Sequence, residues 1–366
     1  MRGEMRIDRL PFKKRAVVIL GAGATRGASF VEELHGVLPP LDGDFFTQAQ
    51  RLSYGKAKQG LRQLTSDVVG LFGPNFQLTM EGYLTRLEQL AHVHDDYRLV
   101  GRPRRNQYRD MRERFVQVLA AVLDEAIGRH PECTHHRTLV TCLDATDTVV
   151  SLNYDWLIDH TLKTHGDGKW NPKIGYGVPV YSGFGRGAGT RYWAFCDAGG
   201  VAQFPHESVK LLKLHGSITW FPVPSTKSPP KLELRKRWWH QRGSLRFEIA
   251  PPEWNKPTRS GVYVPVWREA RKALREASGL VFIGYSLPET DLPVHALFRV
   301  DDQARRLELL VTVNPDQSAR RRIRQALIHR IGKGTRVLSF EKLSEFAGFL
   351  SEGRGQQRRG RGPRTP

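Results

Sequence analysis

Six short apolar runs, each followed at once by glycine or by polar residues, restrict the fold of this chain more than any other feature. They span residues 16–20, 148–151, 209–214, 279–283, 307–313 and 337–340. Short apolar runs bounded by turn residues are typical of buried strands. Between them, residues 82–94 and 108–127 carry apolar side chains at steps of three and four, which predicts amphipathic helices. Strands that alternate with helices predict an α/β fold, with a Rossmann-like, mostly parallel sheet and helices on both faces.

The sequence divides into one large folded domain and two basic ends. The chain has 366 residues, of which 39% are hydrophobic, enough to bury a core over residues 16–350. Inside that domain we predict a helical insertion at about residues 47–143 and two loop-dominated segments, at 166–206 and 221–262. Residues 1–15 are a basic N-terminal segment. Residues 351–366 are rich in Arg, Gly and Gln, a composition that cannot pack a core, so we expect a disordered tail.

Charge and composition also narrow the class of protein. Lys and Arg number 57 against 37 Asp and Glu, which gives a net charge of +20. This charge favours nucleic acid as a partner, although a solvated surface with a solubilising tail is the alternative. No apolar run approaches the ~18 residues of a membrane helix, and the basic start lacks the apolar region of a signal peptide. Three cysteines without paired spacing predict no disulfide framework. We therefore expect a soluble, cytoplasmic protein with no membrane partner.

A glycine-rich turn follows the first apolar run, in the sequence Gly21-Ala22-Gly23-Ala24-Thr25. Small residues let the backbone approach a pyrophosphate, whose charge is favoured by amides at the start of a helix. The glycine spacing differs from the standard dinucleotide fingerprint, so a plain tight turn is the alternative.

Polar residues suited to catalysis follow the second and third runs. Asn153 and Asp155 lie two residues apart, a spacing that directs both side chains into one cleft if the segment is extended. The alternative is that one of them caps the following helix. His215 follows the third run and is a candidate general base, although a lone histidine is more often structural.

The fourth and fifth runs end in the same manner, at Gly284-Tyr285-Ser286 and at Asn314. Ligands of parallel sheets bind outside the carboxyl ends of the strands. Because all of these polar motifs follow strands, we expect them to line one cleft.

Taken in order, the motifs GAGAT, SLNYD, KLHGS, FIGYSLPETD and VTVNP resemble those of the sirtuin-like domain of bacterial defence proteins, within the silent-information-regulator-like superfamily. The likeness extends over residues 16–340. It implies NAD bound on a Rossmann-like sheet, with Asn153, Asp155 and His215 as catalytic residues. A loop at residues 39–46 resembles the one that covers NAD in these relatives. The residues that the resemblance implies for NAD binding are Gly21, Ala22, Gly23, Ala24, Thr25, Asp44, Tyr154, Gly284, Tyr285, Ser286 and Asn314.

The chain departs from protein-deacylating sirtuins in one respect. Those enzymes hold a small domain together with zinc, bound by two pairs of closely spaced cysteines. This sequence has no Cys-x-x-Cys pair. Two other clusters resemble metal ligands, and both are incomplete sets: Cys133, His135 and His136 with the nearby Cys142, and His92 and His94 with Asp95 and Asp96. We therefore expect no metal, and we expect the helical insertion to replace the zinc module.

Without that module, the simplest reaction that the resemblance implies is hydrolysis of NAD to nicotinamide and ADP-ribose. Asn153 would position the attacking water and the ribose hydroxyls, and His215 would act as general base. A protein deacylase or ADP-ribosyltransferase is one alternative, and a non-catalytic NAD- or nucleic-acid-binding subunit is another. Because an unregulated NAD hydrolase would poison its host, we expect gating by homo-oligomerisation, by a nucleic-acid sensor or by a DNA-translocase ATPase partner.

Overall fold

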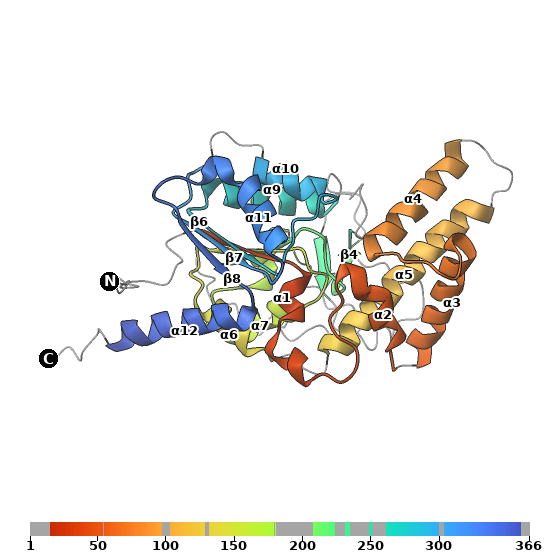
Figure 1. The fold of residues 1–366 in the computed structure, drawn as a ribbon, viewed down its shortest axis with the longest axis horizontal. Coiled ribbons are helices and arrows are strands. Elements are labelled where there is room, and N and C mark those ends of the chain that lie inside the picture. The colour runs from red at the N-terminus through yellow and green to blue at the C-terminus, as the bar shows by residue number, and fades with distance from the viewer. Residues whose placement is uncertain are drawn as a thin grey trace. The chain divides into compact units, whose positions relative to one another are not determined.

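The structure is a computed structural model of the chain (Figure 1). It describes residues 15–53, 55–96, 103–128, 132–178, 180, 208–223, 231–234, 249–250, 261–299 and 304–359. The chain forms two compact units. The sheet unit comprises Met1–Ser29, Glu132–Ile249 and Thr258–Pro366, and the helical unit comprises Phe30–Pro131 with Ala250–Pro257.

The sheet unit is built on six strands in the order β3-β2-β1-β6-β7-β8, and every neighbouring pair is parallel. The strands are β1 (Ala16–Leu20), β2 (Thr148–Ser151), β3 (Lys210–Lys213), β6 (Gly279–Ile283), β7 (Leu309–Val313) and β8 (Arg336–Phe340). All six predicted runs are therefore strands, and the predicted α/β class with a mostly parallel sheet is confirmed.

The strand order locates where a ligand would enter such a sheet. The chain builds outward from β1 through β2 to β3, and then returns to the other side of β1 to build β6, β7 and β8. This is the order of the Rossmann fold, in which the crevice lies at the carboxyl ends of the two central strands, where the order reverses. In this chain those strands are β1 and β6, which pair in register from Ala16 with Gly279 to Leu20 with Ile283.

Helices cover both faces, which explains why the central strands read as continuous apolar runs. In Figure 1, α9, α10 and α11 lie on one side of the sheet, and α6, α7 and α12 lie on the other. Every residue of β1, β2, β6 and β7 is buried. The helices of this unit are α1 (Ala22–Arg26), α6 (Thr134–Thr141), α7 (Leu157–His165), α8 (Pro172–Gly175), α9 (Tyr263–Glu276), α10 (Leu292–Arg299), α11 (Gln317–Ala326), η4 (Ile328–Arg330) and α12 (Leu343–Arg359).

A second, two-stranded sheet lies within the second of the two segments that we expected to be loop-dominated. Strands β4 (Trp220–Val223) and β5 (Lys231–Leu234) pair antiparallel, with Trp220 opposite Leu234. Trp220 and Leu234 are buried. Both strands are only four residues long, and β4 contains Pro222, which is uncommon within strands. The polar and apolar residues of β5 alternate, which was a signal for a strand that we overlooked.

The helical unit is a bundle of α2 (Phe45–Gln50), α3 (Gly55–Phe72), α4 (Met80–Asp96) and α5 (Pro103–Ile127), joined by the short η2 (Asp42–Asp44). Its core is aromatic: Phe115 lies with its ring centroid 4.8 Å from that of Phe45 and 5.4 Å from that of Tyr83. The two predicted helices are present and longer than expected. The insertion is displaced from the predicted 47–143, because α6 belongs to the sheet unit, where it packs on α7 and α12.

The C-terminal segment differs from the disordered tail that we expected from residue 351. Helix α12 continues to Arg359, while residues 360–366 and 1–14 lie outside the described part of the chain. Leu343, Phe346 and Leu350 are buried and anchor the first half of the helix, which the polar second half extends. Among the residues that the structure describes, no helix is both long and apolar enough to cross a membrane.

Candidate active site

The predicted polar motifs of the sheet unit meet at one edge of the sheet. Gly21, Asn153, His215, Gly284 and Asn314 come after β1, β2, β3, β6 and β7, respectively. Since these strands are parallel, their carboxyl ends share that edge. Hydrogen bonds then connect the motifs to one another across the strands.

A hydroxyl group links two of the predicted catalytic residues. The Thr25 hydroxyl donates to Oδ2 of Asp155 over 2.7 Å, and Nδ2 of Asn153 donates to the Thr25 hydroxyl over 3.1 Å. All three residues are buried. The sequence predicted that Thr25 belongs to the phosphate-binding turn. Its side chain is instead hydrogen-bonded to Asn153 and Asp155, two of the residues predicted to be catalytic.

This linkage fixes which way the Asn153 amide faces. A carboxylate only accepts, so the single proton of the Thr25 hydroxyl is committed to Asp155. Thr25 must therefore accept from Asn153, which places Nδ2 on the Thr25 side and leaves Oδ1 on the other. Oδ1 of Asn153 is buried and accepts no hydrogen bond within the described residues. It is available to accept a hydrogen bond from a water molecule or a sugar hydroxyl.

Asp155 also has the structural role that we considered as its alternative. Its Oδ1 accepts from the backbone N–H of Leu157, the first residue of α7, over 3.0 Å. One carboxylate therefore starts the helix and orients Thr25. Asp155 can cap the helix and orient Thr25 at the same time, because Oδ1 accepts from Leu157 and Oδ2 accepts from Thr25.

His215 is held in one tautomer. Its Nδ1 lies 3.2 Å from the carbonyl oxygen of Leu152, which only accepts, so Nδ1 carries the hydrogen. The basic lone pair is therefore on Nε2. That nitrogen lies 3.8 Å from Oδ2 of Asp291, and the ring is 6.1 Å from the ring of Tyr154. His215 is 5% exposed, which shields it from bulk water.

A buried ion pair lies directly behind these residues, and sequence reasoning did not identify it. Nζ of Lys213 is 2.9 Å from Oδ2 of Asp159, and both side chains are fully buried. Lys213 also donates to the carbonyl oxygen of Asp155, and the Tyr176 hydroxyl donates to Asp159. A lysine at the end of an apolar strand was the available signal, since a buried lysine requires a partner.

The predicted glycines join the turn after β1 to the turn after β6. The N–H groups of Gly21 and Gly23 donate to the carbonyls of Ile283 and Gly284, over 3.0 and 2.9 Å. Gly284 has φ +61°, and a Cβ there would lie 2.1 Å from the backbone nitrogen of Ala24. These glycines are therefore needed for close packing of two backbones. Contact with a diphosphate stays a prediction.

The remaining predicted residues of this unit lie beside that turn. Nδ2 of Asn314 donates to the carbonyl of Tyr285 over 3.2 Å, which ties the end of β7 to the end of β6. The guanidinium of Arg322 donates to the carbonyl of Ser286 over 3.0 and 3.1 Å. Ala22 is exposed at the start of α1. Their roles in binding NAD stay predictions.

Asp44 belongs to the helical unit. Its carboxylate accepts from the backbone N–H of Leu41 over 2.7 Å and from the side chain of Gln48 over 3.2 Å. These bonds hold the loop at residues 39–46 on the first turn of α2. The predicted contact of this loop with NAD is untested.

Two residues of the cysteine–histidine cluster, Cys133 and His136, form a hydrogen-bonded pair. Nδ1 of His136 lies 3.1 Å from the sulfur of Cys133, which also accepts from the N–H of Ser29 over 3.3 Å. His135 faces away, with Nδ1 3.2 Å from the carbonyl of Gly27. Within the described residues, no group of three or more His, Cys, Asp or Glu is arranged to hold a metal.

This pair makes stability depend on pH. Burial raises the pKa of the Cys133 thiol. The charge and hydrogen bond of His136, together with the N–H of Ser29, lower this pKa by more than burial raises it, so that it falls from 9.0 to about 6. Between these values the unfolded chain binds the proton and the folded chain does not. The free energy of unfolding should therefore rise with pH from about 6 to 9, by at most about 1.4 kcal/mol per unit.

We expect Cys133→Ser to flatten this dependence, measured by urea unfolding at several pH values. Cys142→Ser, at the other described buried cysteine, is the matched control and should keep the wild-type slope. Equal slopes for wild type and Cys133→Ser would contradict the assignment.

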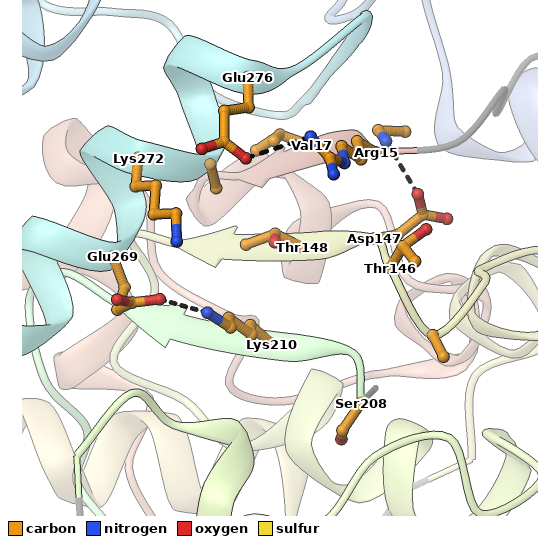
Figure 2. A pocket seen from close by; sticks show the side chains of 13 residues that line it. Arg15, Val17, Thr146, Asp147, Thr148, Ser208, Lys210, Glu269, Lys272 and Glu276 are labelled. Carbon is orange, nitrogen blue, oxygen red and sulfur yellow. Dashed lines mark hydrogen bonds and ion pairs between the residues drawn. The ribbon is translucent and has the colours of Figure 1, made fainter. Parts of the chain in front are cut away.

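A cavity of about 330 Å³ lies at the opposite, amino ends of β1, β2 and β3 (Figure 2). Ion pairs between Arg15 and Glu276, and between Lys210 and Glu269, line it. Asp147 at its edge is buried, which raises its pKa to about 6, and accepts from the N–H of Ala16 over 2.8 Å. Because this cavity is at the far end of the strands, it is separate from the residues considered above.

Thr25 offers a direct test of the linkage at the site. Thr25→Val keeps the shape of the side chain but removes the hydroxyl that orients Asn153. If the site hydrolyses NAD, we expect the turnover number to fall by about tenfold to a hundredfold, because one buried hydrogen bond to a charged group contributes about 1.5–3 kcal/mol. Thr25→Ser retains the hydroxyl and should stay within about threefold of wild type. Equal rates for the valine and serine variants would contradict the proposed orientation.

Comparison with known proteins gives only distant similarities. No family model and no curated relative matches the chain. Among solved structures, a Sir2 homologue in complex with NAD has a TM-score of 0.43 and 12% identity, over 96% of this chain and 92% of that one. A mutant Sir2 homologue with 2′-O-acetyl ADP ribose has a TM-score of 0.39 and 12% identity, over 96% and 95%. At these values we base function on the site residues alone.

Proposed function

We propose that this protein binds NAD at the carboxyl edge of its sheet and hydrolyses it to nicotinamide and ADP-ribose. The observation that carries the proposal is a set of buried polar side chains at the edge where a Rossmann-ordered sheet binds its ligand. Thr25 is hydrogen-bonded to both Asn153 and Asp155. His215 follows the next strand, and its ring is hydrogen-bonded to the carbonyl of Leu152. Burial of a polar atom without a hydrogen-bond partner costs stability, and among the described residues Oδ1 of Asn153 is such an atom.

The chemistry suits these groups. The bond between nicotinamide and the anomeric carbon of the ribose breaks, and the carbon gains positive character. Water then adds to that carbon and loses a proton, so that the products are nicotinamide, ADP-ribose and one proton. Oδ1 of Asn153 would accept a hydrogen bond from the water or from a ribose hydroxyl. Nε2 of His215, the basic nitrogen in the observed tautomer, would take the proton.

The experiment incubates the purified full chain with NAD, with and without an acetylated peptide, and measures nicotinamide and ADP-ribose by chromatography. Nicotinamide release that does not require peptide supports hydrolysis. Release that requires peptide supports a deacylase. Calorimetric NAD binding without any release, including after addition of DNA, supports a non-catalytic subunit.

We further propose that the activity is gated and serves anti-phage defence, as the motif resemblance implies. A net charge of +20 supports nucleic acid or a nucleic-acid-bound partner, such as a sensor or a DNA-translocase ATPase, as the trigger. Self-assembly into a homo-oligomer is the other route. Light scattering and NAD turnover, measured together over a range of protein and DNA concentrations, distinguish the two.

A further inference from the structure

The carboxylate of Asp291 lies close to Nε2 of His215, the nitrogen that we propose as the general base. Oδ2 of Asp291 is 3.8 Å from Nε2 of His215, and the side chains are only 3% and 6% exposed. The same oxygen accepts from the Tyr285 hydroxyl over 2.8 Å. Asp291 follows β6 and His215 follows β3, so the pair spans the site from one half of the sheet to the other.

The loop that carries Asp291 is closed by its own hydrogen bonds. The N–H of Asp291 donates to the carbonyl of Pro288 over 3.0 Å, and Nε2 of His295 lies 2.9 Å from that same carbonyl. The carbonyl of Asp291 accepts from the N–H of His295 over 3.0 Å. Leu287, which is buried, takes a left-handed conformation with φ +49°. A leucine adopts this conformation only where its surroundings impose it, and such positions cluster at functional sites.

We propose that Asp291 is a positioning residue that stabilises the protonated form of His215. The carboxylate faces Nε2, the nitrogen that gains a proton, rather than Nδ1, which is already bonded to the carbonyl of Leu152. An opposite charge within about 4–6 Å favours the charged form of a histidine. Asp291 therefore makes His215 a stronger base and aligns it, while the Tyr285 hydroxyl holds the carboxylate in place.

Two further described residues near His215, Tyr154 and Lys213, do not supply this charge. The ring of Tyr154 lies beside the imidazole, with 6.1 Å between centroids. Lys213, two residues before His215, is directed to Asp159 and to the carbonyl of Asp155. The role of Asp291 in the reaction depends on the proposed NAD hydrolysis, but the ion pair itself can be tested without any activity.

The test is an NMR titration of the full chain with isotopically labelled histidine, in which the His215 signal is assigned by its loss in His215→Ala. Asp291→Asn keeps the shape and an acceptor for Tyr285 but removes the charge. We expect the midpoint of the His215 titration to fall by about 1–2 pH units. Asp291→Ala is measured in parallel, so the result does not depend on the folding of one variant. Glu289→Gln removes an exposed carboxylate from the same loop and should leave the midpoint unchanged.

Kinetics complete the test. In Asp291→Asn the acidic limb of the pH–rate profile should shift to lower pH by the same number of units as the His215 midpoint. The turnover number should be about tenfold lower at pH 8, and KM should stay within about twofold of wild type. An unchanged His215 midpoint in both Asp291 variants overturns the proposal. A shifted midpoint in a protein that releases no nicotinamide supports the ion pair and counts against NAD hydrolysis, so the two failures are distinguishable.

Discussion

His215→Ala should lower the rate of NAD hydrolysis by about 10²–10⁴-fold, the usual contribution of a positioned general base. The reason is the tautomer: Nδ1 is bonded to the carbonyl of Leu152, so Nε2 is the ring nitrogen that can take a proton from water. The loss should appear in the turnover number more than in KM, because the proton moves in the transition state. Initial rates of nicotinamide release measure it, and circular dichroism with thermal unfolding checks the fold.

The control is another histidine of the same unit. His165, in the last turn of α7, pairs with the exposed Glu132 over 2.9 Å and contacts none of the residues considered for the site. His165→Ala should keep the rate within about twofold of wild type. If His215→Ala hydrolysed NAD as fast as His165→Ala, the base would have to be another group.

Much of this site could be predicted from the sequence for a topological reason. Asn153, His215 and Gly284 each lie within two residues of the end of a strand, and a mostly parallel sheet brings the residues after its strands to one edge. No knowledge of contacts is needed for that step. The strand limits were also predictable, because runs buried on both faces are continuous and end sharply at glycine or polar residues.

The interactions within the site were not predictable. The contact of Asp291 with His215 and that of Lys213 with Asp159 join residues 76 and 54 positions apart. Hydrophobic periodicity relates residues a few positions apart, so it does not indicate which distant side chain a residue contacts in the folded chain. Thr25 illustrates the same limit: its place in a glycine-rich turn indicated a phosphate, and its contacts are with Asn153 and Asp155.

Lys213→Met should lower the free energy of unfolding by about 3–5 kcal/mol, because it leaves the Asp159 carboxylate buried without its counter-ion. The side chains of Lys213 and Asp159 are fully buried, so water cannot replace the lost partner. The carbonyl of Asp155 loses a donor as well, which loosens the backbone that positions Asn153. Urea unfolding of the full chain measures the loss, and the NAD hydrolysis rate should fall with it.

The same strand supplies the matched control. Lys210 is also paired with a carboxylate, that of Glu269, but its side chain is 42% exposed, so Lys210→Met should cost only about 0–1 kcal/mol. The double variant Lys213→Met with Asp159→Asn removes both charges and keeps an acceptor for the Tyr176 hydroxyl. It should be more stable than Lys213→Met alone, because the cost arises from an unpaired buried charge rather than from a lost attraction. If Lys213→Met and Lys210→Met cost the same, or if the double variant were less stable still, burial of the pair would not be what makes Lys213 essential.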